Sequence, residues 1–162
     1  MNGVLLDTSY LISLSDPNRA NHAAAKRYFF EAIQRGVMMY LSTIVVSEFE
    51  VKQKIDDFGL HNFIVLPFNI DDAKAAASLT QVAIAARPSG YPRNTVKDDV
   101  KLLAQCETAG ISHFLTDDEN CVVNIETLRK TYGARALPFG IFCGDAFSET
   151  WFNPGNQSTL LD

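Results

Sequence analysis

Short apolar runs that alternate with longer helix-like stretches restrict the fold of this chain more than any other feature. The expected strands are Val4–Leu6, Val37–Leu41, Phe63–Leu66, His113–Leu115 and Ala134–Leu137. The expected helices are Asn21–Arg35, Ile44–Asp57, Asp71–Ala85, Thr95–Ala109 and Asn124–Tyr132. Helices of this length between strands are typical of crossover connections, which join parallel strands. The sequence therefore predicts an α/β fold in which helices cover both faces of a parallel sheet.

Two segments depart from this alternation. Residues 87–93 hold two prolines and a glycine, which predict a loop. The residues after Pro138 carry many aromatic side chains without helical or alternating spacing, a composition that argues against disorder. These aromatic residues are Phe139, Phe142, Phe147, Trp151 and Phe152. We expect a main domain over residues 1–138 and a C-terminal tail over residues 139–162 that packs on this domain or on a partner.

Composition and charge narrow the classes of function. With 47% hydrophobic and 20% charged residues, the chain has the composition of an ordinary globular protein. No apolar run reaches the roughly 18 residues that a membrane span needs, and no basic segment of a secretory signal opens the chain. The three cysteines show neither zinc-binding spacing nor an even number, so we expect reduced thiols in the cytoplasm. The net charge of −5 argues against simple binding of nucleic acid by a basic face.

Acidic residues follow several of the expected strands. Asp7 comes directly after Val4–Leu6, and Glu48 lies about one turn into the helix after the second strand. Two acidic pairs complete the set, Asp98–Asp99 at the start of a helix and Asp117–Asp118 after the fourth strand. Ligands of open parallel sheets bind beyond the carboxyl ends of the strands. We therefore expect these acids to meet at one edge of the sheet.

Each acid also has a structural interpretation. Asp7 and the pair Asp117–Asp118 can end a strand and cap a helix. Glu48 alone is typical of a solvated helix residue. Asp98 fits a capping box with Thr95 as the N-cap residue. The shared placement of these acids after several strands is therefore a stronger signal than any one of them.

A group of carboxylates predicts a site for hard divalent cations. Two carboxylates about 4 Å apart repel by about 4 kcal/mol at an effective dielectric constant of about 20, so protons or cations must offset their charge. Mg²⁺ and Mn²⁺ prefer oxygen ligands, and the sequence offers no set of His and Cys residues for zinc. Such a cation can activate water for attack on a phosphodiester. The candidate metal ligands are Asp7, Glu48, Asp99, Asp117 and Asp118. Neighbours on a helix point about 100° apart, so we expect Asp99 rather than Asp98 to be the ligand.

Hydroxyl and basic side chains flank the acidic positions. Ser9 and Thr116 are next to the acids in the sequence and either support the metal site or cap helices. Basic residues bracket the loop at residues 87–93, where they either contact RNA phosphates or form a solvated face. These basic residues are Arg87, Arg93, Lys97 and Lys101.

Four segments resemble the motifs of PIN-domain nucleases, and those of VapC-type toxin ribonucleases in particular. They are Val4-Leu5-Leu6-Asp7-Thr8-Ser9, Leu41–Phe49, Lys97–Ala104 and Leu115–Asn120, in the order that the family has them. The resemblance runs from about residue 3 to residue 138. It implies an α/β/α sandwich around a parallel sheet of about five strands. It also implies a ribonuclease that depends on Mg²⁺ or Mn²⁺.

The resemblance assigns site residues and partners as well. The acids of the family fall on Asp7, Glu48, Asp99 and Asp118, with Asp117 as a rival for the last position. Many toxin-type members are homodimers that a neighbouring antitoxin neutralises. The long loop before Asp99 and the tail are departures from the compact toxins. An RNA-processing or host-defence nuclease would share the same site.

Two other classes of function remain open. A non-catalytic PIN-like module that binds RNA or protein is the main alternative, although such modules lose acids that this sequence keeps. A phospho-acceptor receiver domain needs paired acids after the first strand and a lysine after the last strand. Here Asp7 alone follows the first strand, and the last expected strand leads to Pro138.

Overall fold

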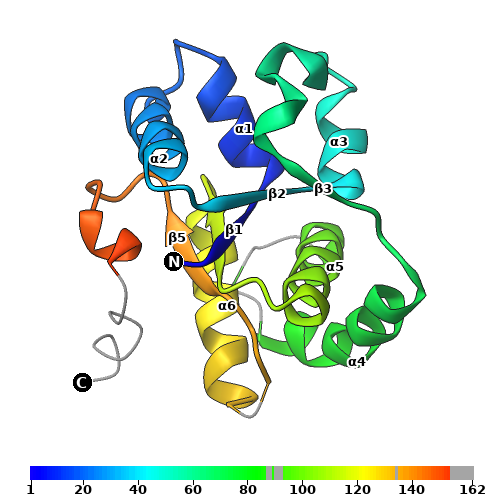
Figure 1. Cartoon of the computed structure of the whole chain (residues 1–162). Coiled ribbons are helices and arrows are strands. Elements are labelled where there is room, and N and C mark those ends of the chain that lie inside the picture. Colours follow the sequence, from blue (N-terminus) through cyan, green and yellow to red (C-terminus); the bar gives the residue numbers. More distant parts are fainter. Residues whose placement is uncertain (87–88, 90–92, 134, 154–162) are drawn as a thin grey trace.

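A five-stranded parallel sheet lies at the centre of the fold (Figure 1). The computed structural model describes residues 1–86, 89, 93–133 and 135–153. Its strands are β1 (Gly3–Leu6), β2 (Met38–Ser42), β3 (Ile64–Leu66), β4 (His113–Thr116) and β5 (Phe139–Phe142). Their order is β3-β2-β1-β4-β5, and every neighbouring pair is parallel. The predicted α/β class and the parallel sheet of about five strands are therefore confirmed.

Six α-helices in the described part of the chain cover the two faces of this sheet. They are α1 (Thr8–Ser15), α2 (His22–Gln34), α3 (Thr43–Phe49), α4 (Ile70–Ala86), α5 (Arg93–Ala109) and α6 (Glu119–Thr131). The chain moves from β1 to β3 through the first three helices and then turns back to β4 and β5 through the last three. Right-handed crossovers place these two groups on opposite faces, which gives a three-layer α/β/α sandwich. None of the described helices combines the length and the apolarity that a membrane crossing requires.

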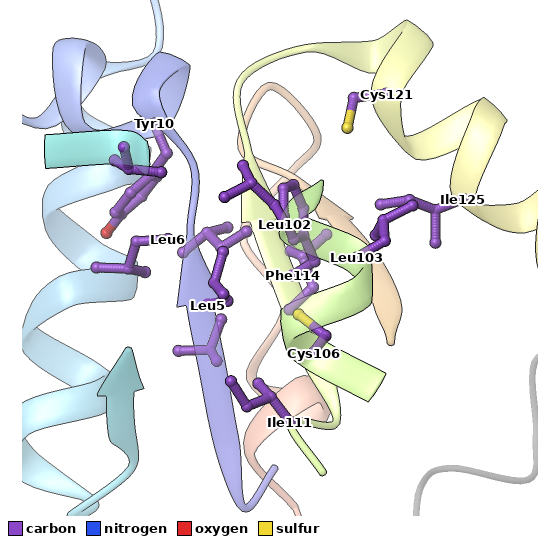
Figure 2. Packing of buried hydrophobic residues seen from close by; sticks show 14 of the residues in the cluster. Leu5, Leu6, Tyr10, Leu102, Leu103, Cys106, Ile111, Phe114, Cys121 and Ile125 are labelled. Atoms are coloured by element: carbon purple, nitrogen blue, oxygen red, sulfur yellow. The ribbon is translucent and has the colours of Figure 1, made fainter. Parts of the chain in front are cut away.

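The core fills both sides of the two central strands. Leu5 and Leu6 of β1 are buried, and Figure 2 shows them between Tyr10 of α1 and Leu103 of α5. The Tyr10 hydroxyl donates to the carbonyl of Ala25 at 2.9 Å, which joins α1 to α2. All residues of β1 and β4 are buried, because both strands lie inside the sheet with helices on its two faces.

The prediction of a fifth strand at Ala134–Leu137 is wrong. Residues 135–138 form no strand, and Phe139–Phe142 pairs with β4 instead. Gly140 suits this position, because a Cβ atom there would lie 3.1 Å from Cγ1 of Val122 on α6. The small residue lets α6 pack closely on β5. The boundary expected after Pro138 thus directly precedes the last strand of the sheet.

Several helix ends also differ from the prediction. The segment Thr8–Ser15 forms α1, which the sequence pattern did not identify as a helix. The expected helix Ile44–Asp57 ends as α3 at Phe49, and a separate 3₁₀ turn, η1, covers Ile55–Phe58. The predicted loop at residues 87–93 lies outside the described residues except for Ser89 and Arg93, the first residue of α5.

Phe147 and Phe152 of the aromatic tail pack on α2 of the same chain. The rings of Phe147 and Phe152 lie 4.8 and 6.2 Å from the ring of Tyr28. The guanidinium of Arg27 lies 4.0 Å from the centre of the Phe147 ring. Glu149, which opens the 3₁₀ turn η3 (Glu149–Phe152), lies 3.5 Å from Arg27. The aromatic tail therefore covers an apolar stripe of α2.

Replacing Phe152 by Ala should test this packing. Phe152 is buried, so we expect the free energy of unfolding to fall by about 2–4 kcal/mol. Thr150→Ala, in the same 3₁₀ turn but exposed, should change it by less than about 0.5 kcal/mol. Chemical denaturation of both variants measures the difference. Equal stability of the two variants would show that the tail contributes no packing energy.

His113 should make the stability of the fold depend on pH. Burial, together with the charges of the N-terminal ammonium and Arg129, lowers the pKa of His113 to about 4, and burial is the largest of these causes. The imidazole of His113 therefore binds its proton near pH 6.5 in the unfolded chain but only near pH 4 in the folded chain. This difference stabilises the fold fully above pH 6.5 and is lost as the pH falls from 6.5 to 4, up to about 3 kcal/mol. In His113→Phe, unfolding measured at several pH values should lack this contribution. An identical pH profile of both proteins would contradict the assignment.

Candidate active site

The carboxylate of Asp7 lies at the junction of the two central strands. Asp7 follows β1, and its backbone N–H donates to the carbonyl of Leu115 at 3.0 Å, which extends the pairing of β1 with β4. Its Oδ2 accepts hydrogen bonds from Ser9 at 2.6 Å and from Thr116 at 2.7 Å. The hydroxyls of Ser9 and Thr116 lie 3.0 Å apart. The two hydroxyls that the sequence pointed to therefore hold one acid in a fixed orientation.

Asp7 is an acid in an environment that disfavours its charge. The residue is 9% exposed, and burial raises the pKa of its carboxyl above the usual value. The hydrogen bonds from Ser9 and Thr116 lower the pKa and offset part of this cost. No Lys or Arg side chain of the described residues forms a salt bridge with Asp7. Its partners are the hydroxyl groups of Ser9 and Thr116 and the backbone N–H groups of Thr8 and Ser9, which stabilise the negative charge without neutralising it.

Glu48 approaches Asp7 from the helix that follows β2. The hydroxyl of Thr8 at the start of α1 donates to Oε2 of Glu48, which ties α1 to α3. Burial raises the pKa of Glu48, the Thr8 hydrogen bond lowers it, and the charges of Asp7 and Asp98 raise it again. Because these charges act on Glu48, the acids after β1 and β2 share one region of the molecule. The role of Thr8 was not predicted from the sequence.

Cys121, in the first turn of α6, lies next to Asp99. Its thiol is buried and forms a hydrogen bond with Asp99 of α5. Burial raises the pKa of this thiol well above the usual value, and the charges of Asp99, Asp7 and Asp118 raise it further. Three of the predicted ligands therefore lie around one neutral thiol. Cys121 was missed by the sequence reasoning, because a lone cysteine carries no recognisable spacing.

The two acids of the pair after β4 have different surroundings. Asp118 caps α6, and its Oδ1 accepts from the backbone N–H of Asn120 at 2.9 Å. Asp117 turns the other way: its Oδ1 accepts from Asn21 at 2.6 Å and its Oδ2 from Ser13. Asp117 thus fastens the end of β4 to α1 and to the residue before α2. Of the pair, Asp118 is the acid near Cys121.

The pair on α5 is divided as well. Asp99 is buried near Cys121, whereas Asp98 forms a salt bridge of 2.8 Å with Lys101 and acts electrostatically on Glu48. The predicted capping box is wrong, because α5 begins at Arg93 and places Asp98 in its second turn with no acid in the first. The helix dipole therefore gives no reason for the two acids to be there.

The predicted RNA-contacting residues are placed only in part. Lys97 is exposed on α5, and Lys101 lies one turn further along the same helix, where its charge lowers the pKa of Glu48. Arg87 lies outside the described residues, and the structure describes the backbone of Arg93 but not its side chain.

The acids converge without forming a closed cage. Among the described residues, no three His, Cys, Asp or Glu side chains are arranged to hold a metal ion as they stand. The side chains of these acids offer carboxylate oxygen atoms, which Mg²⁺ and Mn²⁺ prefer as ligands. Mg²⁺ keeps several of its waters and takes one or two carboxylates directly, so widely placed acids still fit it.

Comparisons with known proteins show the fold but give no match by sequence. No protein-family model matches the chain, and no curated protein does. One similar structure is VapC20 from Mycobacterium tuberculosis, described as a toxin that cleaves the sarcin-ricin loop. It has a TM-score of 0.52 at 17% identity and covers 74% of this chain and 92% of its own. Another is VapBC2 from Rickettsia felis bound to promoter DNA, with a TM-score of 0.53 at 12% identity, covering 86% and 97%. The chain therefore has the PIN-domain fold of VapC proteins.

The different roles of the two acids after β4 can be tested by stability. Asp117→Asn should lower the free energy of unfolding by about 1–3 kcal/mol, because Asn21 and Ser13 lose a charged acceptor. Asp118→Asn should change it by less than about 1 kcal/mol, because Asn is an equally good N-cap residue. Urea denaturation of both variants gives the comparison. A larger loss in Asp118→Asn would reverse the assignment.

Proposed function

We propose that this protein is a metal-dependent endoribonuclease that cleaves RNA phosphodiesters with water as the nucleophile. One observation carries the proposal. Asp7 is buried, its charge acts on Glu48, and the charges of Asp7, Asp99 and Asp118 all act on the buried thiol of Cys121. Capping explains Asp118, but it does not explain why acids from three other segments of the chain act on the same region. A bound cation would reduce the mutual repulsion of these carboxylates.

The ligands of this proposed cation are Asp7, Glu48, Asp99 and Asp118. We leave Asp117 out, because both of its oxygens already join β4 to other elements. A bound Mg²⁺ or Mn²⁺ supplies an activated water and charge stabilisation for the phosphate. The chain itself orients the acids: Ser9 and Thr116 fix Asp7, Thr8 fixes Glu48, and the first turn of α6 fixes Asp118.

RNA would approach along α5. Lys97 and Lys101 present positive charge beside the acidic edge, where phosphate groups of the strand must pass. With a net charge of −5, the chain has little general attraction for nucleic acid. We therefore assign binding of RNA to these local lysines and to the cation, and not to a wide basic face.

A protein partner is part of the proposal. Phe30 and Ile33 of α2 and Ile64 and Val65 of the edge strand β3 are large apolar side chains that remain exposed, with Phe30 54% exposed. Such side chains favour burial against another protein. We propose an antitoxin as the partner, as in a toxin–antitoxin pair, and a homodimer as the assembly. The cytoplasm, which keeps Cys106, Cys121 and Cys143 reduced, is the proposed location.

Replacing Asp7 by Asn should abolish cleavage and keep the fold. Asn has the same shape and loses the charge that a cation needs, so we expect cleavage of a generic single-stranded RNA to fall by at least about 100-fold. Asp71→Asn is the matched control, because Asp71 is exposed on α4 away from the proposed ligands. Gel analysis of the RNA products in Mg²⁺, with and without EDTA, measures the effect.

Direct binding of Mn²⁺ gives a readout that does not depend on activity. Calorimetric titration should detect Mn²⁺ in the wild type and in Asp71→Asn but not in Asp7→Asn. Cleavage by Asp7→Asn at the wild-type rate, or cleavage that persists in EDTA, would overturn the proposal. Binding of RNA without cleavage at any Mg²⁺ concentration would instead identify a non-catalytic binding module.

A further inference from the structure

A large cavity lies at the end of the sheet opposite to the acidic edge. It has a volume of about 520 Å³ and is formed by the C-terminal half of α6, the start of β5 and the turn η3. β5 begins at Phe139, which pairs with His113, the first residue of β4. The cavity is therefore at the amino ends of the strands, whereas Asp7 and Asp118 follow their carboxyl ends. Nothing in the proposed nuclease function uses it.

The cavity is basic, although the chain as a whole is acidic. Arg129, Lys130 and Arg135 line it together with one acid, Glu126. Arg135 is engaged with Glu107, to which its Nε donates at 2.8 Å. The buried Nη1 of Arg129 lies 3.7 Å from Oε1 of Glu126, which is beyond hydrogen-bond distance, so it has an ion-pair neighbour but no hydrogen bond. Lys130 is exposed and takes part in no salt bridge among the described residues. Two cations of the cavity thus retain donors for an anion.

Position at a helix end does not explain these features. Basic residues are favoured in the last turn of a helix, and Arg129 and Lys130 lie in the last turn of α6. That preference accounts for their charge but not for a buried N–H group that makes no hydrogen bond, because burying such a group costs free energy unless a hydrogen-bond partner is supplied. Nη1 of Arg129 therefore has a charged neighbour in Glu126 but can still donate a hydrogen bond to a ligand.

Aromatic rings form the remaining wall. The guanidinium of Arg129 lies 3.3 Å from the centre of the Phe139 ring, which holds it in place at the cavity. Trp151 of η3 lines the cavity and meets His113 at 84°, an edge-on contact that does not stack the two rings face to face. A planar ring can stack on an aromatic face of this kind. The cavity therefore combines anion donors with a stacking surface.

We propose that this cavity binds one nucleotide, with its phosphate at Arg129 and Lys130 and its base stacked on Trp151. Arginine forks and lysine ammonium groups are the usual donors to phosphate, and base–aromatic stacking is tolerant of sequence. The volume suits a single small ligand. The nucleotide is either free or the 5′-phosphorylated end of an RNA strand. Binding needs no metal and none of the acids at the other end of the sheet.

The lone tryptophan of the chain gives a direct readout. Trp151 is the only Trp in the sequence, so its fluorescence reports on this cavity alone. Adenosine 5′-monophosphate, added in EDTA, should quench this fluorescence saturably, and adenosine without phosphate should bind at least about tenfold more weakly. A short RNA with a 5′-phosphate, compared with the same RNA with a 5′-hydroxyl, tests the strand end as the source. Saturable binding of either phosphorylated probe supports the proposal and names the source.

Matched variants locate the binding. Lys130→Gln, on an exposed side chain, should weaken binding of the phosphorylated probe by about tenfold. Arg129→Lys keeps the charge but loses the planar fork and should weaken it as well. Lys54→Gln, an exposed lysine that pairs with Glu50 beyond the end of α3, should leave it unchanged, and so should Asp7→Asn. Melting temperatures show that each variant is folded.

The outcomes that overturn the proposal are equally definite. They are absence of saturable quenching up to about 10 mM of either phosphorylated probe, equal binding of adenosine and its monophosphate, and unchanged binding by Lys130→Gln. Equally tight binding of indole-3-acetate would show a site for aromatic carboxylates instead of nucleotides. Loss of RNA cleavage in Asp7→Asn bears on the nuclease alone, so the two proposals fail separately.

Discussion

The hydrogen bonds around the Asp7 carboxylate are the constraint on which the rest of the acidic edge depends. A buried carboxylate is strongly unfavourable unless donors surround it. Here Ser9 comes from the start of α1 and Thr116 from the end of β4, so the donors that stabilise the charge also join two central strands. Asp117 is drawn into the same network, because its backbone N–H donates to the Ser9 hydroxyl at 2.9 Å. The position of each acid after β1 and β4 therefore depends on the pairing of these strands.

The parts of the fold that the sequence predicted are those with strong local patterns. The four strands from β1 to β4 are short, apolar runs bounded by polar residues, and α2, α4 and most of α5 show helical composition. β5 was misplaced because its segment, Phe139–Phe142, has the aromatic composition of the tail that follows it. Its identity as a strand depends on Gly140 fitting against α6, which is a property of the packing.

The candidate site divides in the same way. The sequence was sufficient to predict one shared edge for Asp7, Glu48, Asp99 and Asp118, because parallel strands end at one edge of a sheet. The difference between Asp117 and Asp118 was not, since it depends on the distant residues Ser13 and Asn21. The contacts of Thr8 and Cys121 with the acids could not be predicted for the same reason. Sequence patterns predict which elements lie next to one another. The direction of a side chain depends on the hydrogen-bond partners that the neighbouring element provides.

The acids of this edge are held apart by separate donors, and this explains how the chain tolerates them. Hydroxyl groups hold Asp7 and Glu48, a thiol approaches Asp99, and backbone N–H groups hold Asp118. These donors are neutral, so each lowers the cost of one charge without cancelling the field of the group. A salt bridge to each acid would have removed that field and with it any attraction for a cation. The arrangement thus keeps the fold stable while the carboxylates remain negative, which is the combination that a divalent ion and its hydration shell require.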